Sequence, residues 1–182
     1  MLILCWPFSA RAQNLEGGFH VGVGWVGETD LTPSEGSFEY GVIALLWPTD
    51  TLAISGYWSF LPLNDVLGSR DSVPLGEIDR NRQYVDITLQ YHFFRRARYS
   101  IFAEGGGGSF WNNRWVVNPG GFSDFVPQGK ESTHHAMWTV GGGFRYRLRP
   151  HVNWINQLKM HNLGSTSKDG LEVFTGVTVS WK

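Results

Sequence analysis

Phe174-Thr175-Gly176-Val177-Thr178-Val179-Ser180-Trp181 alternates apolar residues with small or polar ones, and it ends on an aromatic side chain. Successive side chains of a β-strand point to opposite faces, so this period predicts a strand with one apolar and one polar face. The same period of two recurs along the whole chain. The sequence therefore predicts an all-β protein, and a length of 182 residues predicts a single domain.

This segment also resembles the closing strand of bacterial outer-membrane β-barrels. Those strands commonly carry a polar residue, a glycine, two free positions and then alternating hydrophobic residues with a final aromatic. Thr175, Gly176, Val179 and Trp181 fit that pattern, with Lys182 as a one-residue overhang. The resemblance implies that the barrel-assembly machinery reads this segment during insertion, and that membrane lipid and lipopolysaccharide surround the folded protein.

Eight alternating segments can be counted, and the connections between them alternate in length. In an up-and-down barrel every second connection lies at the same end, so short and long connections separate to opposite ends, as they do in outer-membrane barrels. The sequence therefore predicts an eight-stranded antiparallel up-and-down transmembrane β-barrel. The expected strands are 15–26, 37–47, 51–60, 81–93, 98–111, 132–148, 151–163 and 170–181. The short connections are 48–50, 94–97 and 149–150, and the long ones are 27–36, 61–80, 112–131 and 164–169.

The two faces of each segment differ in polarity. We expect the apolar face to point outward, because the other face brings charges of both signs into one lumen where they can pair. Eight strands enclose an interior that side chains fill, so the sequence predicts a plugged lumen and not a pore. A soluble, lipocalin-like barrel with the apolar face inside is the alternative. The expected lumen charges are Glu39, Asp86, Glu104, Glu172, Arg145, Arg147 and Lys159.

Composition agrees with a chain that faces lipid. Charged residues make up 17% of the sequence, against about 25% in ordinary soluble domains, and aromatic residues make up 15%. A formal net charge of −1 argues against nucleic acid as a partner, because that calls for a clustered basic face. Trp138 and Trp154 are open to interpretation as core residues. Five tryptophans near expected strand ends are predicted to lie at the lipid–water boundary: Trp25, Trp47, Trp58, Trp111 and Trp181.

The first twelve residues are typical of a secretory signal peptide. Met1 to Phe8 is mostly apolar, and Ala10-Arg11-Ala12 supplies a small-x-small cleavage pattern. We expect residues 1–12 to be the signal and 13–182 to be the barrel domain. A charged leading segment is missing, which indicates either a truncated or a misassigned start. An apolar start to the folded chain is the alternative. The single cysteine, Cys5, lies in this segment, so the mature chain is expected to form no disulfide.

Several other features invite a functional interpretation that their context does not support. The run Gly105 to Ser109 lacks the lysine and helix of a phosphate loop, and crowding or bending of the barrel wall explains it better. Six histidines are too scattered to predict a metal site, and no cofactor is expected. Four acidic loop residues are expected to be solvated charges. The histidines are His20, His92, His134, His135, His151 and His161, and the acidic residues are Asp65, Asp71, Glu77 and Asp79.

The segment His161-Asn162-Leu163-Gly164-Ser165, with Glu172 following, loosely resembles the end of the lipid A 3-O-deacylases. That resemblance implies a hydrolytic triad in which a histidine activates a serine and a glutamate orients the imidazole. However, Leu163 stands where the serine of that family lies, and the nearest hydroxyl belongs to Ser165. His161 also shares a face with Lys159, on the lumen side. We therefore expect no catalytic residues, and keep His161, Ser165 and Glu172 as the alternative.

As a whole the chain most resembles the superfamily of small outer-membrane barrels that includes the barrel of outer-membrane protein A. This resemblance implies a location in the cell outer membrane. The predicted function is an integral membrane protein with a structural or surface-interaction role carried by its loops. What those loops bind is not encoded in any motif of the sequence.

Overall fold

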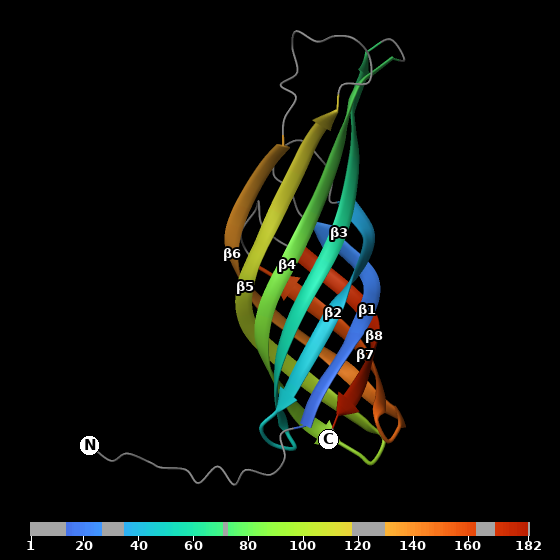
Figure 1. The fold of residues 1–182 in the computed structure, drawn as a ribbon, viewed down its shortest axis with the longest axis vertical. Helices are drawn as coiled ribbons and strands as arrows, with labels where there is room; N and C mark the ends of the chain where they lie inside the picture. The colour runs from blue at the N-terminus through green and yellow to red at the C-terminus, as the bar shows by residue number, and fades with distance from the viewer. Residues whose placement is uncertain (1–13, 27–34, 71–72, 118–129, 163–169, 182) are drawn as a thin grey trace, which may run out of the picture.

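Eight antiparallel strands close into a single barrel (Figure 1). The computed structural model describes residues 14–26, 35–70, 73–117, 130–162 and 170–181. Each strand pairs with its neighbours in sequence, as an up-and-down barrel requires. The described part of the chain includes no helix suited to crossing a membrane. The strands are β1 (Asn14–Val26), β2 (Glu35–Trp47), β3 (Leu52–Arg70), β4 (Val73–Arg95), β5 (Tyr99–Val117), β6 (Lys130–Arg149), β7 (Val152–His161) and β8 (Gly170–Trp181).

The predicted closing strand does close the barrel. β8 pairs with β1 from Leu15 opposite Trp181 to Val26 opposite Gly170. This pairing leaves the sheet without open edges along the barrel wall, which removes the free backbone groups that an edge strand would present. The predictions of an all-β fold, eight strands and antiparallel order are confirmed.

The three connections predicted to be short lie together at one end of the barrel, which also holds the C-terminal end of β8 (Figure 1). They comprise residues 48–51, 96–98 and 150–151. β3, β4 and β5 extend furthest toward the opposite end. We call these the short-turn end and the long-strand end.

The connection predicted at 61–80 is mostly a hairpin, so that prediction was wrong. β3 and β4 stay paired until Arg70 lies opposite Val73, and only residues 71–72 separate the two strands. β2 pairs with β3 no further than Tyr40 opposite Phe60. Beyond that point one side of β3 is an edge, and an edge strand tolerates a proline such as Pro62.

The connection predicted at 112–131 is also shorter than expected. β5 continues to Val117 and β6 begins at Lys130, with Trp115 opposite Lys130 in the last pair. The acidic residues Asp65, Glu77 and Asp79 lie in strands whose side chains are outside the described structure, and Asp71 lies outside it altogether. The prediction that these charges are solvated stays a prediction.

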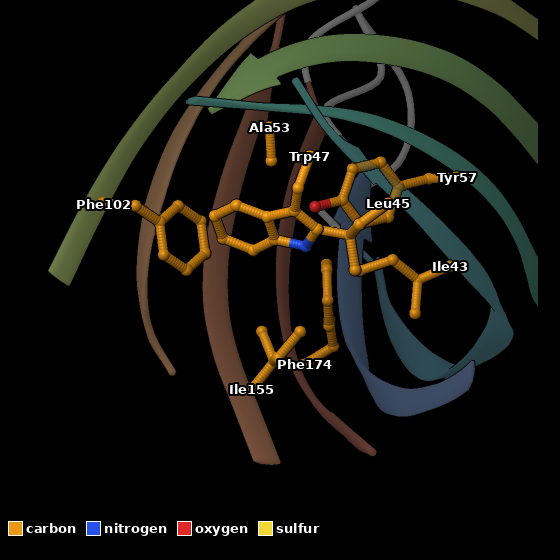
Figure 2. Close-up of a cluster of buried hydrophobic side chains, with 8 residues drawn as sticks. All are labelled: Ile43, Leu45, Trp47, Ala53, Tyr57, Phe102, Ile155 and Phe174. Carbon is orange, nitrogen blue, oxygen red and sulfur yellow. The ribbon is translucent and has the colours of Figure 1, made fainter. Parts of the chain in front are cut away.

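The predicted separation of faces is confirmed along β4. Alternate residues from Val85 to Phe93 are exposed on the outer wall, and those from Tyr84 to His92 are buried inside. The interior also holds apolar side chains. Figure 2 shows one such cluster, formed by Ile43, Leu45, Trp47, Ala53, Tyr57, Phe102, Ile155 and Phe174.

Glycines in β5 are explained by crowding between neighbouring strands. A Cβ atom built on Gly106 would lie 2.1 Å from the carbonyl oxygen of Ile87, and one on Gly108 would lie 1.9 Å from that of Val85. No side chain fits at these distances. The interpretation of the run Gly105 to Ser109 as a crowded wall and not a phosphate loop is therefore confirmed at these two positions.

Candidate functional site

The outer wall of the barrel is apolar. Ile87, at 64% exposed, and Leu89, at 50%, are large hydrophobic side chains that a soluble protein would bury. A contiguous apolar wall around a polar interior is the reverse of a soluble barrel, so the lipocalin-like alternative is wrong. Other large apolar side chains exposed on this wall include Phe19, Phe38, Val42, Phe93, Trp138, Trp154 and Val173.

Of the five tryptophans predicted to lie at the lipid–water boundary, Trp25, Trp58 and Trp181 are exposed, and Trp111 is only partly exposed. Trp138 and Trp154 are exposed as well, so their interpretation as core residues was wrong. The prediction was wrong for Trp47 at the end of β2, because its indole is 9% exposed and packs inside the barrel.

A buried ion pair joins opposite walls of the lumen. Lys159 Nζ on β7 lies 2.6 Å from Asp86 Oδ2 on β4, and both side chains are 1% exposed. The same ammonium lies 3.4 Å from the centre of the Tyr57 ring on β3, within the range of a cation–π interaction. Lys159 therefore links three strands across the interior.

Glu104 on β5 is the centre of a hydrogen-bond network. It accepts hydrogen bonds from Thr88 Oγ1 at 2.9 Å, from Gln90 Nε2 at 3.2 Å and from Gln157 Nε2. The hydroxyl of Tyr57 lies 3.2 Å from Glu104 Oε2, and it accepts a 2.6 Å hydrogen bond from Gln90. A buried carboxylate needs such partners, because an unpaired charge in an apolar medium is very costly.

Glu16 on β1 is a lumen charge that sequence analysis did not name. It pairs with Arg145 on β6 and accepts a 3.1 Å hydrogen bond from Thr178 on β8. The period of two places Glu16 and His20 on one face of β1, but the glycines between them interrupt the alternation of polar and apolar residues, so the polar face is not evident from the sequence. Arg147, predicted in the lumen, is exposed at the short-turn end.

The residues of the deacylase alternative are only partly brought together. His161 Nε2 lies 3.2 Å from Glu172 Oε2, so the histidine and the glutamate are neighbours. The hydroxyl near the ring is that of Thr139, 3.0 Å from His161 Nδ1. Ser165 lies outside the described residues. His161 and Glu172 are each 1% exposed and face the lumen, as predicted for His161.

A similar cluster lies on β1, β2 and β3. His20 Nε2 lies 3.0 Å from Ser59 Oγ and 3.3 Å from Glu39 Oε1. All three side chains are buried. Two histidine–glutamate pairs therefore sit inside the barrel wall, and both are enclosed by aromatic rings: Phe174 beside His20, and Tyr84 stacked on His161.

The remaining histidines are dispersed. His92 is buried and lies 3.0 Å from Ser100 Oγ, whereas His134 and His151 are exposed. Within the described ranges no three histidine, cysteine, aspartate or glutamate side chains are arranged to hold a metal ion.

No protein-family model matches the sequence, and no curated protein matches it either. Solved structures do match. Neisserial surface protein A has 13% sequence identity and a TM-score of 0.64, covering 92% of this chain and 97% of that one. Ail, the attachment invasion locus protein of Yersinia pestis, has 13% identity and a TM-score of 0.60, covering 91% and 98%. The N-terminal β-barrel domain of Pseudomonas aeruginosa OprF has 14% identity and a TM-score of 0.56, covering 92% and 97%.

These similarities show the fold of the small eight-stranded outer-membrane β-barrels. The apolar outer wall is the physical counterpart of that fold, because only a lipid surrounding makes such a wall stable. Fold and wall together place the protein in the bacterial outer membrane. In such barrels the short turns face the periplasm.

Proposed function

We propose that this chain is a non-enzymatic integral outer-membrane protein with a filled lumen and a structural or surface-interaction role. The observation that carries this proposal is the network that crosses the interior between Tyr57, Glu104 and Gln157, on β3, β5 and β7. A channel would leave this space to water.

Three kinds of contact support a filled lumen. The ion pair of Lys159 with Asp86 spans it, the hydrogen bonds of Glu104 occupy it, and a second apolar cluster adds Leu61, Leu63, Tyr84, Phe110 and Met137. An eight-stranded barrel is just wide enough for its own side chains. The contents of the lumen therefore stabilise the barrel, and they leave function to its surface.

Ion conductance in planar lipid bilayers tests the filled lumen. The purified wild-type barrel is expected to carry no steady ohmic current. The double variant Y57A/Q157A, which removes side chains from the centre of the network, serves as a positive control and is expected to conduct. A steady current through the wild-type protein, equal to that of this variant, would make it a pore and refute the proposal.

A surface-interaction role is supported by the long-strand end. The hairpin of β3 and β4 continues for nine more paired positions beyond Phe60, to Arg70, without pairing to β2. Ail, whose fold this chain shares, is named the attachment invasion locus protein, and one of its structures contains the heparin analogue sucrose octasulfate. We carry over only the general class of role. Protease added to intact cells is expected to cleave within 61–80, and a hairpin protected on intact cells but cleaved after lysis would contradict this orientation.

Export and insertion belong to the same proposal. Residues 1–12 are removed as a signal peptide, the mature chain begins at Gln13, and the assembly machinery recognises β8. Intact-mass measurement of the protein extracted from membranes tests the first point. A mass that still includes residues 1–12 would contradict it.

A further inference from the structure

The short-turn end opens into a cavity of about 790 Å³ that is ringed by arginines. Two carboxylates, Glu16 and Asp50, also line it, so the charge is strongly positive. We call this feature the arginine mouth. Its five arginines come from the ends of β4 and β6 and from the turn that follows β4: Arg95, Arg98, Arg145, Arg147 and Arg149.

Two of the five arginines are already engaged. Arg145 pairs with Glu16, and its guanidinium lies 4.6 Å from the centre of the Trp47 ring at the base of the mouth. Arg95 donates a hydrogen bond to the backbone carbonyl of Asp50. These contacts neutralise Glu16 and fix the lower wall of the cavity.

The other three arginines form no ion pair within the described residues, and Asp50 is the one carboxylate of the mouth that no arginine side chain pairs with there. These three, Arg98, Arg147 and Arg149, are exposed. The backbone N–H of Arg147 donates a 2.6 Å hydrogen bond to the carbonyl of Arg98, which ties the turn after β4 to β6. With Glu16 paired, the unpaired arginines outnumber the one remaining carboxylate, and this excess of positive charge in one opening favours an anion.

The mouth is continuous with the lipid-facing wall. A smaller hollow beside it is lined by Arg95, Arg96 and Arg98. The guanidinium of Arg96 lies 5.3 Å from the centre of the ring of Phe94, which is itself exposed on the outer wall. The positive surface therefore runs from the opening to Phe94 on the outer wall, close to the short-turn end, where lipid headgroups are expected.

We propose that the arginine mouth binds the phosphate of an anionic phospholipid of the periplasmic leaflet. Guanidinium groups form paired hydrogen bonds with phosphate oxygens, and they match phosphate geometry better than an ammonium does. Free phosphate has the same chemistry, but the continuity through Arg96 favours a phosphate attached to acyl chains. The inference rests on the placement in the outer membrane, and not on a filled lumen or on the role of the loops.

Native mass spectrometry of the barrel in neutral detergent tests this proposal. Phosphatidylglycerol, phosphatidylcholine with the same acyl chains, and inorganic phosphate are titrated separately. The triple variant R98Q/R147Q/R149Q removes the unpaired arginines. R147Q removes an arginine at the short-turn end, and R80Q removes one toward the long-strand end. The two single variants therefore form a matched pair. The heat-dependent shift in electrophoretic mobility tests whether each variant is folded. If the triple variant does not fold, the lipid affinity of R147Q is compared with that of the wild-type protein instead.

The wild-type protein is expected to bind phosphatidylglycerol more tightly than phosphatidylcholine. The triple variant should lose about tenfold or more in affinity for phosphatidylglycerol alone, since loss of one charge-assisted bond is worth at least that factor. R147Q should weaken binding and R80Q should not. Equal binding of phosphatidylglycerol by the wild-type and triple-variant proteins would overturn the proposal. If inorganic phosphate binds as tightly as phosphatidylglycerol, the site is specific for phosphate itself, and the proposal of a lipid ligand is overturned. If the wild-type barrel conducts ions and still binds the lipid, the proposal of a filled lumen is refuted and the proposal of a lipid site stands.

Discussion

Lys159 and Asp86 form an ion pair that spans the barrel between β7 and β4, with 2.6 Å between Nζ and Oδ2 and 1% exposure of each side chain. Burying two charges costs several kcal/mol each, and only a close pairing offsets that cost. Removal of one partner therefore matters far more than removal of both.

K159M is expected to lower the free energy of unfolding by about 3–5 kcal/mol, because it leaves the carboxylate of Asp86 buried and unpaired. The double variant K159M/D86L should recover most of this loss, since it leaves no buried charge at either position. Urea unfolding in lipid vesicles measures the free energy of unfolding of the single and the double variant. A double variant no more stable than K159M would show that the pair does not act as a unit.

The loss in the free energy of unfolding that an outward-facing charge causes should depend on the depth of that charge in the membrane. L89R places an arginine near the middle of β4, and we expect a loss of about 2–4 kcal/mol in the free energy of unfolding. L15R makes the same change at the short-turn end of β1, where about 0–1 kcal/mol is expected. Both leucines are 50% exposed. Equal costs from the same unfolding measurement would mean that Leu89 is not in the lipid core.

The sequence predicted which residues face the lumen wherever the period of two was unbroken. Lys159 and Glu172 were placed correctly because successive side chains of a strand must alternate. Trp47 was misplaced although the same rule locates it: Glu39 lies on the lumen side, and an even number of positions separates the two residues. Its position near a strand end was given more weight than its face.

What the sequence could not predict is which lumen residues meet. Lys159 reaches Asp86, and Arg145 reaches Glu16, only because of the stagger between strands that closes the barrel. Alternation says nothing of that stagger. The hairpin at 61–80 was missed for a related reason, because its sequence has no sustained apolar alternation, and nothing in the sequence shows that Arg70 lies opposite Val73.

The closing strand should matter more for assembly than for the stability of the finished barrel. V179S/W181S removes two outward-facing apolar residues from β8, and we expect a strong fall in the amount of folded protein in the membrane. L158S/W154S makes the equivalent change on the neighbouring β7 and is the matched control. Pulse labelling followed by electrophoresis without heating measures insertion. Equal defects in the two variants would indicate that β8 carries no special signal.

The hydroxyl of Tyr57 is a shared partner of three buried polar groups, on Glu104, Gln157 and Gln90. Y57F keeps the ring and removes that hydroxyl, so we expect a loss of about 1–3 kcal/mol in the free energy of unfolding from partners left unsatisfied. Y40F is the control, because Tyr40 is exposed on the outer wall. A Y57F variant as stable as Y40F would show that the network contributes nothing to stability.

The final prediction concerns catalysis. Wild-type protein is expected to release no fatty acid from lipopolysaccharide, because His161 is enclosed in the lumen between Tyr84, whose ring is stacked 4.8 Å away, and Thr139. An acyl ester held in the membrane has no approach to that ring. H161A should therefore change stability and leave the lipid composition as it is, with E172A as a second variant on the same pair. Mass spectrometry of lipid A from membranes with and without the protein measures this. Removing one member of a catalytic triad destroys most of the activity of the whole. Loss of one acyl chain in the presence of wild-type protein, abolished by H161A and by S165A, would establish a hydrolase.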